Sequence, residues 1–303
     1  MEIRIRTEDG MDARMALPMT WRRQLWKTGL TMKISLIQMN SRINRDENVD
    51  LALGMVASAA GDGADLVVVP EFFNREYFPQ YRDYKYMEYA ETDDGYTQTR
   101  MKAAAREHGV WLVSTIFEME RPGLYYDTAM LIGPDGEIVG KYRKVHPAAL
   151  LSLEKIYFRG GSSFPVFRVG EWTVGISTCY DNLFPESCRC LALRGAELIV
   201  APYATPVDDP WENFLTTRAL ENGVYFAACN HVGQEGEWRM SGKSMVISPS
   251  GRILIQASGT EEQTIAWDIE REEVVQARRR FPLMRDRRPD SYAEIARPVE
   301  ELL

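Results

Sequence analysis

The sequence lacks several features that would each indicate a particular class of protein. No apolar run approaches the ~18 residues that a membrane-spanning helix needs, and the first residues lack the apolar core of a secretory signal. Only four cysteines occur in 303 residues, and their spacing shows no disulfide framework. No basic stripe interleaved with aromatic residues offsets the net charge of −8. We therefore expect a cytoplasmic protein that binds neither membranes nor nucleic acids.

The composition is that of a globular protein with a sizeable core, at 45% apolar and 26% charged residues. Residues 1–31 are rich in Arg and Met and show no clear period, whereas the first strand pattern begins at Met32. No linker rich in Pro, Gly or Ser divides the rest of the chain. We expect residues 1–31 to be an N-terminal extension that need not be ordered, and residues 32–303 to form a single domain.

The order of the expected elements predicts the fold class. Short apolar runs of the buried-strand type, such as 65–70 and 197–202, alternate with helix patterns, such as 46–60 and 96–108. Strands separated by turn signals then follow, and this order occurs twice. The sequence therefore predicts an α/β protein with two mixed β-sheets that face each other and helices outside.

Cys179 stands where a strand pattern runs into a helix start. Side chains alternate over 172–178, while Pro185 and Glu186 suit the first turn of a helix. Free backbone N–H groups and the positive end of the helix dipole would lower the pKa of the thiol and stabilise an oxyanion. The alternative is a buried structural cysteine, which is the commoner fate of a free Cys.

Cys188 and Cys190 resemble a metal-binding pair only superficially. They lie two positions apart on a predicted helix and so point to nearly opposite sides, which prevents them from sharing one ion. We expect a structural role for both, and no metal site.

Glu71 and Lys144, like Cys179, follow strand patterns, and the carboxyl ends of strands are where sheet proteins build sites. A thiol nucleophile needs a base, an acyl oxygen needs a positive group, and a leaving amine needs a proton. Taken singly, Glu71 could cap a helix, and Lys144 could belong to a solvated basic run with Lys141 and Arg143.

Three short motifs carry a resemblance to a known family. PEFF at 70–73, GKYRKVHP at 140–147 and CYDNLFPE at 179–186 each resemble a motif of the nitrilase superfamily, the carbon-nitrogen hydrolases. The similarity extends from about residue 32 to residue 292. It implies a four-layer α-β-β-α sandwich that usually pairs into a homodimer or a larger homo-oligomer.

The resemblance also implies roles for four residues. Glu71 would be the general base, Lys144 would hold the oxyanion, and Cys179 would be the nucleophile. Glu154 matches the extra carboxylate of the family, which supports the lysine and positions substrate; a surface helix charge is the alternative. The backbone N–H of Tyr180 would complete the oxyanion hole, and no cofactor is required.

The residues after the cysteine bear on the substrate. Cys-Tyr-Asp at 179–181 resembles amidases and carbamoylases more than true nitrilases, which usually carry Cys-Trp-Glu. Carbamoylases that act on free amino acids tend to place arginines next, where this chain has Asn182 and Leu183. We expect hydrolysis of a small amide or N-carbamoyl amine through a thioester, with release of ammonia. The candidates for the substrate pocket, any of which could instead be a core residue, are Phe72, Asn74, Tyr77, Tyr180, Asn182 and Tyr203.

Three alternatives stay open. The enzyme could be a nitrilase, or a Cys/His hydrolase that uses His146 or His231 as its base. The third alternative is a non-catalytic small-molecule binding or scaffold protein, which would release no ammonia from any amide.

Overall fold

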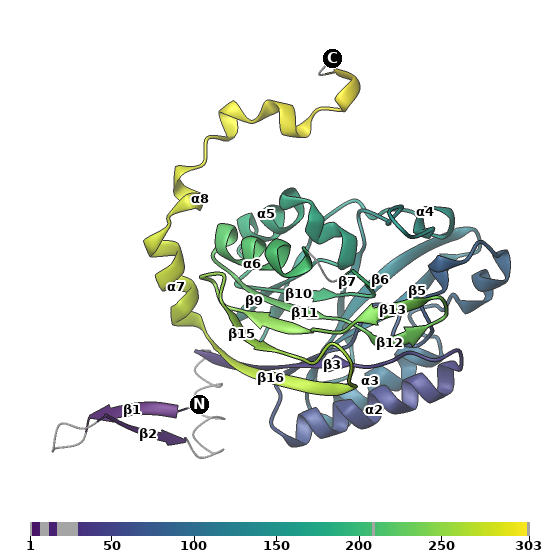
Figure 1. Cartoon of the computed structure of the whole chain (residues 1–303), viewed down its shortest axis with the longest axis horizontal. Coiled ribbons are helices and arrows are strands. Elements are labelled where there is room, and N and C mark those ends of the chain that lie inside the picture. Colours follow the sequence, from purple (N-terminus) through teal and green to yellow (C-terminus); the bar gives the residue numbers. More distant parts are fainter. Residues whose placement is uncertain (1, 7–11, 17–29, 208–209, 302–303) are drawn as a thin grey trace.

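The computed structural model describes residues 2–6, 12–16, 30–207 and 210–301. Within the expected N-terminal extension, strands β1 (Glu2–Arg6) and β2 (Asp12–Ala16) pair with each other as a separate antiparallel sheet. Figure 1 shows this hairpin beside the body of the molecule. Most of the rest of the extension lies outside the described residues.

The first large sheet has six strands in the order β16-β3-β4-β5-β6-β7. Its central strands β3, β4 and β5 run parallel, and the other pairings are antiparallel. Its strands are β3 (Thr31–Gln38), β4 (Leu66–Val68), β5 (Trp111–Arg121), β6 (Leu124–Ile132), β7 (Ile138–Arg143) and β16 (Gln263–Glu270).

The second large sheet repeats this arrangement in the order β15-β14-β11-β10-β9-β8. Strands β9, β10 and β11 are parallel, with antiparallel strands on both sides. The predicted pair of mixed sheets is confirmed. Its strands are β8 (Val166–Val169), β9 (Trp172–Ile176), β10 (Leu198–Pro202), β11 (Tyr225–Cys229), β14 (Met245–Ile247) and β15 (Ile253–Gln256).

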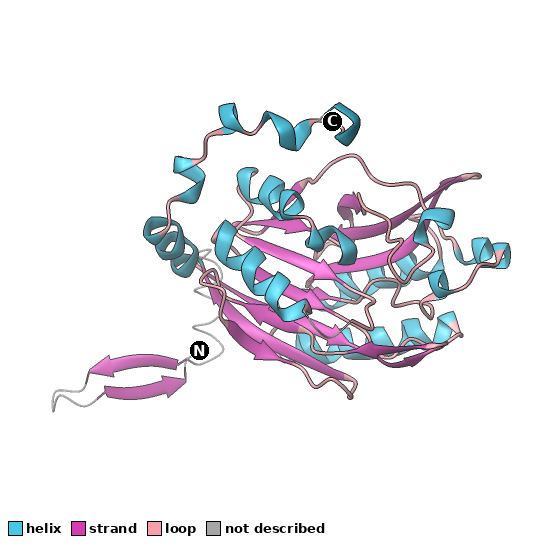
Figure 2. Cartoon of the chain, turned by 45° about the horizontal axis from the view of Figure 1, so that its top comes forward, coloured by secondary structure: helices cyan, strands magenta, loops and turns pink. Residues whose placement is uncertain are grey.

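Helices cover the outer faces of both sheets, which gives the predicted α-β-β-α layers (Figure 2). On the first sheet, α2 (Arg45–Gly61) and α3 (Tyr96–His108) bury one apolar cluster. On the second sheet, α5 (Pro185–Leu193) and α6 (Trp211–Asn222) bury another. The sequence favours these helix ends because Gly109 and Gly223 adopt left-handed C-caps after α3 and α6.

The core between the sheets follows from the alternation along each strand. Trp172, Val174 and Ile176 of β9 pack in one cluster with Leu36 of β3 and Val68 of β4. Both sheets therefore turn an apolar face inward, and their strand ends lie along a shared edge where the following turns can meet.

Shorter elements surround that edge. The segment 72–94 contains the 3-10 turns η1 (Phe78–Gln80) and η2 (Tyr84–Tyr89). The hairpin of β12 (Val232–Glu235) and β13 (Trp238–Ser241) was not predicted. Its residue Met240 and half-buried Trp238 belong to an aromatic cluster with Phe72 and Tyr77. α4 (Glu154–Tyr157) is a single turn.

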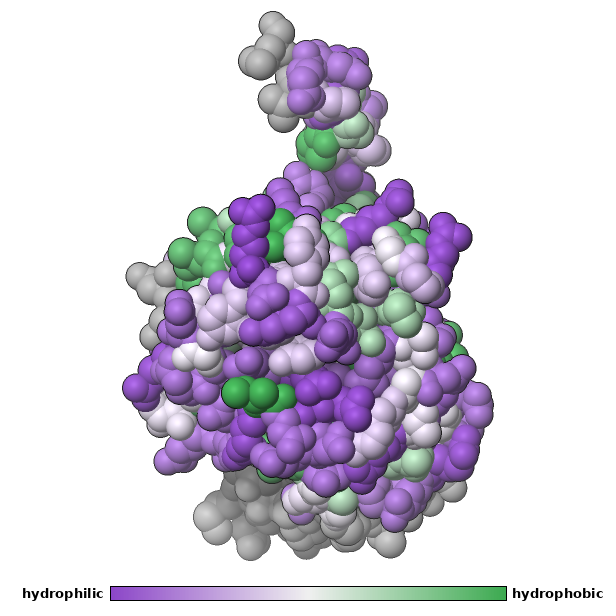
Figure 3. Space-filling model, turned by 90° about the vertical axis from the view of Figure 1, so that its right-hand side faces the viewer, coloured by the Kyte–Doolittle hydropathy of each residue, from purple (hydrophilic) through white to green (hydrophobic). Residues whose placement is uncertain are grey.

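The C-terminal segment contains α7 (Arg271–Arg280), α8 (Leu283–Asp286) and the 3-10 turns η4 (Pro289–Ser291), η5 (Ala293–Ala296) and η6 (Val299–Glu301). Val274 of α7 is buried in the core between the sheets, whereas the chain beyond α8 extends away from the body of the molecule (Figure 1). Hydrophilic residues dominate the face drawn in Figure 3. Across the described ranges, no helix combines the length and hydrophobicity that crossing a membrane requires.

Candidate active site

Turns that follow three strands bring the predicted catalytic residues together. Glu71 follows β4, Lys144 follows β7, and Cys179 follows β9, while Glu154 is the first residue of α4. Lys144 Nζ lies 2.7 Å from Glu71 Oε1 and 2.8 Å from Glu154 Oε2. The charges of Glu71 and Lys144 also act on the Cys179 thiol. These four residues, which are far apart in the chain, therefore form one cluster.

Lys144 is buried, with 1% of its surface exposed. Burial alone would lower the pKa of its ammonium group, but Glu154 and Glu71 outweigh this effect and raise that pKa well above its usual value. Lys144 is therefore a fixed positive charge that carries three N–H donors into the cluster.

Cys179 occupies a strained backbone turn. Its φ angle is 46°, in the left-handed region that non-glycine residues rarely adopt. The Asn182 side-chain amide holds the turn by donating to the carbonyl oxygens of Ser177 at 2.9 Å and of Cys179 at 3.1 Å. The half-buried thiol is thereby presented beside Glu71 and Lys144.

The helix predicted to start at Pro185 is confirmed, with Glu186 in the first turn of α5. A 3-10 turn, η3 (Cys179–Leu183), begins at the cysteine and separates it from the start of α5. Burial and the charge of Glu71 raise the pKa of the Cys179 thiol well above its usual value, although Lys144 opposes them. This corrects the expectation of a lowered thiol pKa, and it means that the resting thiol is protonated and needs a base.

One carboxylate oxygen of Glu71 accepts a hydrogen bond, and the other does not. Its Oε1 accepts from Lys144, whereas no donor in the described part of the chain reaches Oε2. The backbone carbonyl of Glu71 accepts from His231 Nε2, and its N–H donates to the carbonyl of Tyr203 at 3.3 Å. The next residue, Phe72, has a φ angle of 55°. The carboxylate therefore stands on a fixed backbone with an oxygen available for a proton.

His231 is held away from the thiol. Its Nδ1 lies 2.7 Å from Glu235 Oε1 while its Nε2 donates to the Glu71 carbonyl. Burial lowers the pKa of this imidazole, but Glu235 outweighs burial and raises it. The two ring nitrogens therefore face Glu235 and the Glu71 carbonyl, which leaves neither of them for the thiol. The other candidate base, His146, pairs through Nδ1 with Asp181 Oδ1 at 2.7 Å.

Glu154 is the second carboxylate around the lysine. It accepts from the Tyr77 hydroxyl at 2.6 Å and from the Ala148 N–H at 2.7 Å, in addition to Lys144. Burial raises the pKa of its carboxyl group. Tyr77 is itself buried and stacks on Trp238, with ring centroids 4.9 Å apart. Glu154 is thus an interior residue of the site rather than a surface helix charge.

The other predicted pocket residues lie in different surroundings. Asn74 is buried and donates to Glu91 Oε1 and Thr97 Oγ1. Tyr203 is buried, and its hydroxyl has no hydrogen-bond partner among the described residues. Tyr180 is half-buried and meets the Phe184 ring edge-on. Their contacts with substrate, like those predicted for Phe72, Tyr77 and Asn182, stay predictions.

Asp127 is a further buried member of the cluster, and no sequence motif indicated it. This β6 residue is 2% exposed, and its Oδ2 lies 3.4 Å from Lys144 Nζ. Its backbone carbonyl accepts from the Lys144 N–H at 2.9 Å, which fixes the two residues side by side. The available signal was a charged residue in a strand that otherwise carries none.

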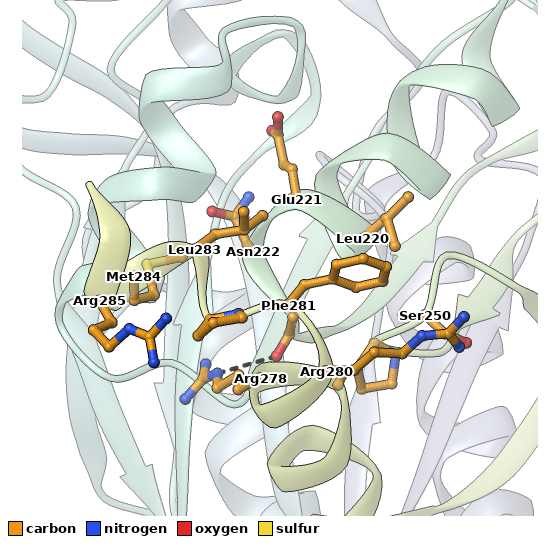
Figure 4. A pocket seen from close by; sticks show the side chains of 14 residues that line it. Leu220, Glu221, Asn222, Ser250, Arg278, Arg280, Phe281, Leu283, Met284 and Arg285 are labelled. Atoms are coloured by element: carbon orange, nitrogen blue, oxygen red, sulfur yellow. Dashed lines mark hydrogen bonds between the residues drawn. The ribbon is translucent and has the colours of Figure 1, made fainter. Parts of the chain in front are cut away.

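A separate surface pocket of about 350 Å³ lies between α6 and the start of the C-terminal segment. Figure 4 shows its lining, with Arg278 donating to the carbonyl of Gly223 and Phe281 and Leu283 beside it. None of the residues that line it belongs to the cluster around Lys144.

Comparison with known proteins agrees with the motifs. A model of the carbon-nitrogen hydrolase family matches residues 33–279. The chain is 38% identical over 234 residues to a nitrilase of Pyrococcus abyssi, covering 77% of this chain and 87% of that protein. It is 32% identical over 279 residues to the omega-amidase NIT2 of Homo sapiens, covering 88% and 99%.

Solved structures show the same relationship. A carbon-nitrogen hydrolase from Helicobacter pylori G27 superposes with a TM-score of 0.83 at 27% identity, covering 88% of this chain and 99% of that one. An amidase mutant from Nesterenkonia sp. AN1, with the acetamide moiety of fluoroacetamide on its active-site cysteine, gives 0.76 at 30% identity, covering 86% and 95%. The chain therefore belongs to the carbon-nitrogen hydrolase family, within the nitrilase superfamily.

Proposed function

We propose that this hydrolase cleaves the carbon-nitrogen bond of a small amide or N-carbamoyl amine and releases ammonia, with Cys179 as nucleophile. One observation carries the proposal. Glu71 keeps Oε2 free of donors in the described part of the chain, beside a half-buried thiol whose pKa is raised. A protonated thiol next to a carboxylate oxygen without a partner is the arrangement that general-base activation needs.

Acylation begins with transfer of the Cys179 proton to Glu71 Oε2. The sulfur then forms a bond to the carbonyl carbon, and the C=O electron pair moves onto the oxygen. Lys144 gives N–H bonds to Glu71 and Glu154 and has a third donor for the oxyanion, which the Tyr180 N–H also stabilises. Glu71 is the catalytic base of this step.

The leaving group departs with the proton held by Glu71. The C–N bond breaks as Glu71 protonates the nitrogen, so ammonia leaves and a thioester remains on Cys179. A water molecule then gives a proton to Glu71 and its oxygen to the acyl carbon. Collapse of this second intermediate breaks the C–S bond, and the sulfur recovers the proton from Glu71. The sum is amide plus water giving acid plus ammonia.

Lys144 and Glu154 keep this geometry without changing charge. Glu154 accepts a second hydrogen bond from the lysine, and the Tyr77 hydroxyl and the Ala148 N–H fix Glu154 in turn. The aromatic residues proposed to position the substrate near the thiol are Tyr180, Phe72 and Tyr203. Asn74 and Asn182 are the other proposed pocket residues, and their side-chain amides hold neighbouring parts of the chain by hydrogen bonds.

An amide is the substrate class that the similar proteins favour. The relatives include proteins described as omega-amidases, and the structural neighbours include amidases. A nitrile is the second candidate because one relative is described as a nitrilase. The Cys-Tyr-Asp sequence at 179–181 supports the amide, and comparing turnover of matched amides and nitriles separates the two.

The proposal extends to the assembly, the domain and the location of the protein. We propose a homo-oligomer, a homodimer in its simplest form, because the family resemblance implies one. We also propose that residues 32–303 are the working domain. The four cysteines are free, which fits a reducing compartment such as the cytoplasm.

Ammonia release from a panel of aliphatic amides, ω-amides and N-carbamoyl amines tests the reaction. We expect at least one class to be hydrolysed by the wild type and by Cys190→Ala, a variant at an exposed cysteine, but not by Cys179→Ala. Failure of the whole panel, with Cys179 shown to be reduced, would overturn the enzyme proposal in favour of a binding protein.

A further inference from the structure

Three carboxyl groups surround the single ammonium of Lys144. Its Nζ lies 2.7 Å from Glu71 Oε1, 2.8 Å from Glu154 Oε2 and 3.4 Å from Asp127 Oδ2. All four side chains are at most 2% exposed. One positive charge cannot balance three carboxylates in an interior where each uncompensated charge costs several kcal/mol. At least one carboxyl group therefore holds a proton at rest.

The hydrogen bonds identify which carboxyl group that is. Glu154 accepts from three groups: Lys144, the Tyr77 hydroxyl and the Ala148 N–H. Glu71 accepts from Lys144 through Oε1. Neither oxygen of Asp127 receives a hydrogen bond from any donor in the ranges that the structure describes. Asp127 is therefore the group for which ionisation has the least support.

We propose that Asp127 is a neutral carboxylic acid that donates its proton to Glu71, and that it acts as a positioning residue for the general base. Glu71 Oε1 and Asp127 Oδ2 lie 2.7 and 3.4 Å from the same Lys144 Nζ, and neither Glu71 Oε2 nor either oxygen of Asp127 accepts a hydrogen bond from a donor among the described residues. Two ionised carboxylates at this site would have no proton to share, whereas a proton on Asp127 supplies the donor that Glu71 Oε2 lacks.

The surroundings of Asp127 oppose its ionisation. Burial raises the pKa of its carboxyl well above the usual value, and Glu71 adds to the effect while Lys144 opposes it. Its neighbour on β5 is the uncharged Phe117. The titratable groups that face it come from the turns after β4 and β7, from α4 and from β7 itself: Glu71, Lys144, Glu154 and Tyr142.

In this arrangement two donors orient the carboxylate of Glu71, the proposed base. Lys144 fixes Oε1, and the Asp127 hydroxyl orients the carboxylate from the other oxygen. This inference rests on the proposed function. Glu71 Oε2 can take the thiol proton through one lone pair while the Asp127 donor occupies the other. Ionisation of Asp127 at high pH would put a second negative charge beside the base and remove the donor.

Infrared difference spectra test the proton location without requiring turnover. We expect a protonated-carboxyl band at pH 7 that is lost in Asp127→Asn. The band should persist in Thr128→Val, which alters the next residue of β6, on its other face. If Asp127→Asn leaves the band intact, the proposal is wrong. This reading stands even if no amide is hydrolysed.

The pH profile of kcat/KM tests the effect on the base. Asparagine keeps a neutral donor, so we expect Asp127→Asn to stay within about tenfold of wild type at pH 7 and to lose any alkaline decline caused by Asp127. Asp127→Leu has no donor, and its acid limb should move up by about one pH unit. Thr128→Val should change the melting temperature alone. Profiles of both Asp127 variants that superimpose on wild type would overturn the positioning role, as would a loss above about 100-fold in Asp127→Asn.

Discussion

Lys144 is a buried ammonium whose neighbours decide what it can do. Buried ion pairs often contribute little net stability, because desolvation offsets much of the attraction, but removing one partner leaves an uncompensated charge. Lys144 holds Glu71 and Glu154 at once, at 2.7 and 2.8 Å. The lysine therefore fixes the positions of two carboxylates in addition to its proposed role at the oxyanion.

Lys144→Met should reduce kcat/KM for the best amide by roughly 10² to 10³, the loss typical of one oxyanion donor. Ammonia release measures this change. Lys141→Met is the matched control, because Lys141 lies on β7, the strand that Lys144 follows, but pairs with Asp93 and Glu118. If Lys144→Met stayed active while His231→Ala abolished turnover, the lysine mechanism would have to be replaced by a histidine one.

For the residues of the site, the sequence predicted which side chains lie together but not their protonation states. Glu71, Lys144, Cys179 and Glu154 were named from motifs and lie in one cluster. The thiol pKa was mispredicted because it depends on burial and on the charge of Glu71, which is 108 positions away in the chain. Asp127 was missed because its significance arises only from its distance to Lys144.

The strands β5, β6 and β7 are joined by a buried charge cluster on the face opposite the site. Glu118 of β5 accepts from Arg143 Nε at 2.8 Å, from Lys141 Nζ at 2.9 Å and from Thr128 Oγ1 at 2.6 Å. Burial raises the pKa of Glu118, but these partners outweigh burial and lower it to about 2. Ionised Glu118 therefore stabilises the strand ends that carry Lys144.

Glu118→Gln should lower the free energy of unfolding by about 3 kcal/mol at pH 7 and by about 1 kcal/mol at pH 3. A depressed folded-state pKa stabilises the protein above the unfolded value of 4.5, and the contribution is lost as pH falls toward about 2. Urea unfolding of both proteins across this range measures the difference. A difference that did not change with pH would show that Glu118 acts through packing rather than charge.

The backbone at Gly161 packs closely against the end of β7. Its N–H donates to the Lys144 carbonyl at 2.8 Å, and a Cβ at this position would lie 2.1 Å from the Arg143 carbonyl oxygen. Gly161→Ala should therefore destabilise the protein by about 1–3 kcal/mol and lower kcat/KM by displacing Lys144. Gly54→Ala is the control: its Cβ would have no neighbour within 4 Å, and alanine in α2 should stabilise by about 0.5–1 kcal/mol.

A thermal melt and a turnover assay of the two glycine variants check this pair of expectations. An unchanged melting temperature for Gly161→Ala would mean that the backbone yields without cost, which would contradict the tight contact with Arg143.

Among the elements, strong periodic patterns were predicted and locally irregular ones were not. The buried runs at 65–70 and 197–202 became β4 and β10 because every residue of those strands is buried. The β12–β13 hairpin was missed because its sequence lacks a clear apolar alternation, and it includes the buried Glu235, which binds the N–H of Tyr77. Pro185 marked the start of α5, but the turn at Cys179 has no such signal.

On the scale of the whole molecule, the two sheets share one arrangement of strands. Three parallel strands lie at the centre of each sheet, and antiparallel strands complete it on both sides. The repeated order of strand and helix patterns predicted this, because each half must bury one face on the other. The assembly could not be predicted from local pattern, since the surfaces that meet a second copy follow no fixed period.

Removing residues 1–29 should leave the melting temperature and kcat/KM close to those of the full chain. Strand β3 begins at Thr31, which pairs with Glu270 of β16, and β1 and β2 pair with each other in a sheet of their own. Thermal denaturation and ammonia release test the expectation. A large loss of either property would show that the extension is part of the working domain.

We expect Cys179 to carry the acyl group during amide hydrolysis, and intact mass spectrometry of enzyme quenched in acid during turnover would detect this adduct. The mass should increase by that of the acyl group in the wild type and in Cys190→Ala, located to the peptide containing Cys179, and should not increase in Cys179→Ala. Steady ammonia release by Cys179→Ala, or an acyl group on another residue, would rule out Cys179 as the nucleophile.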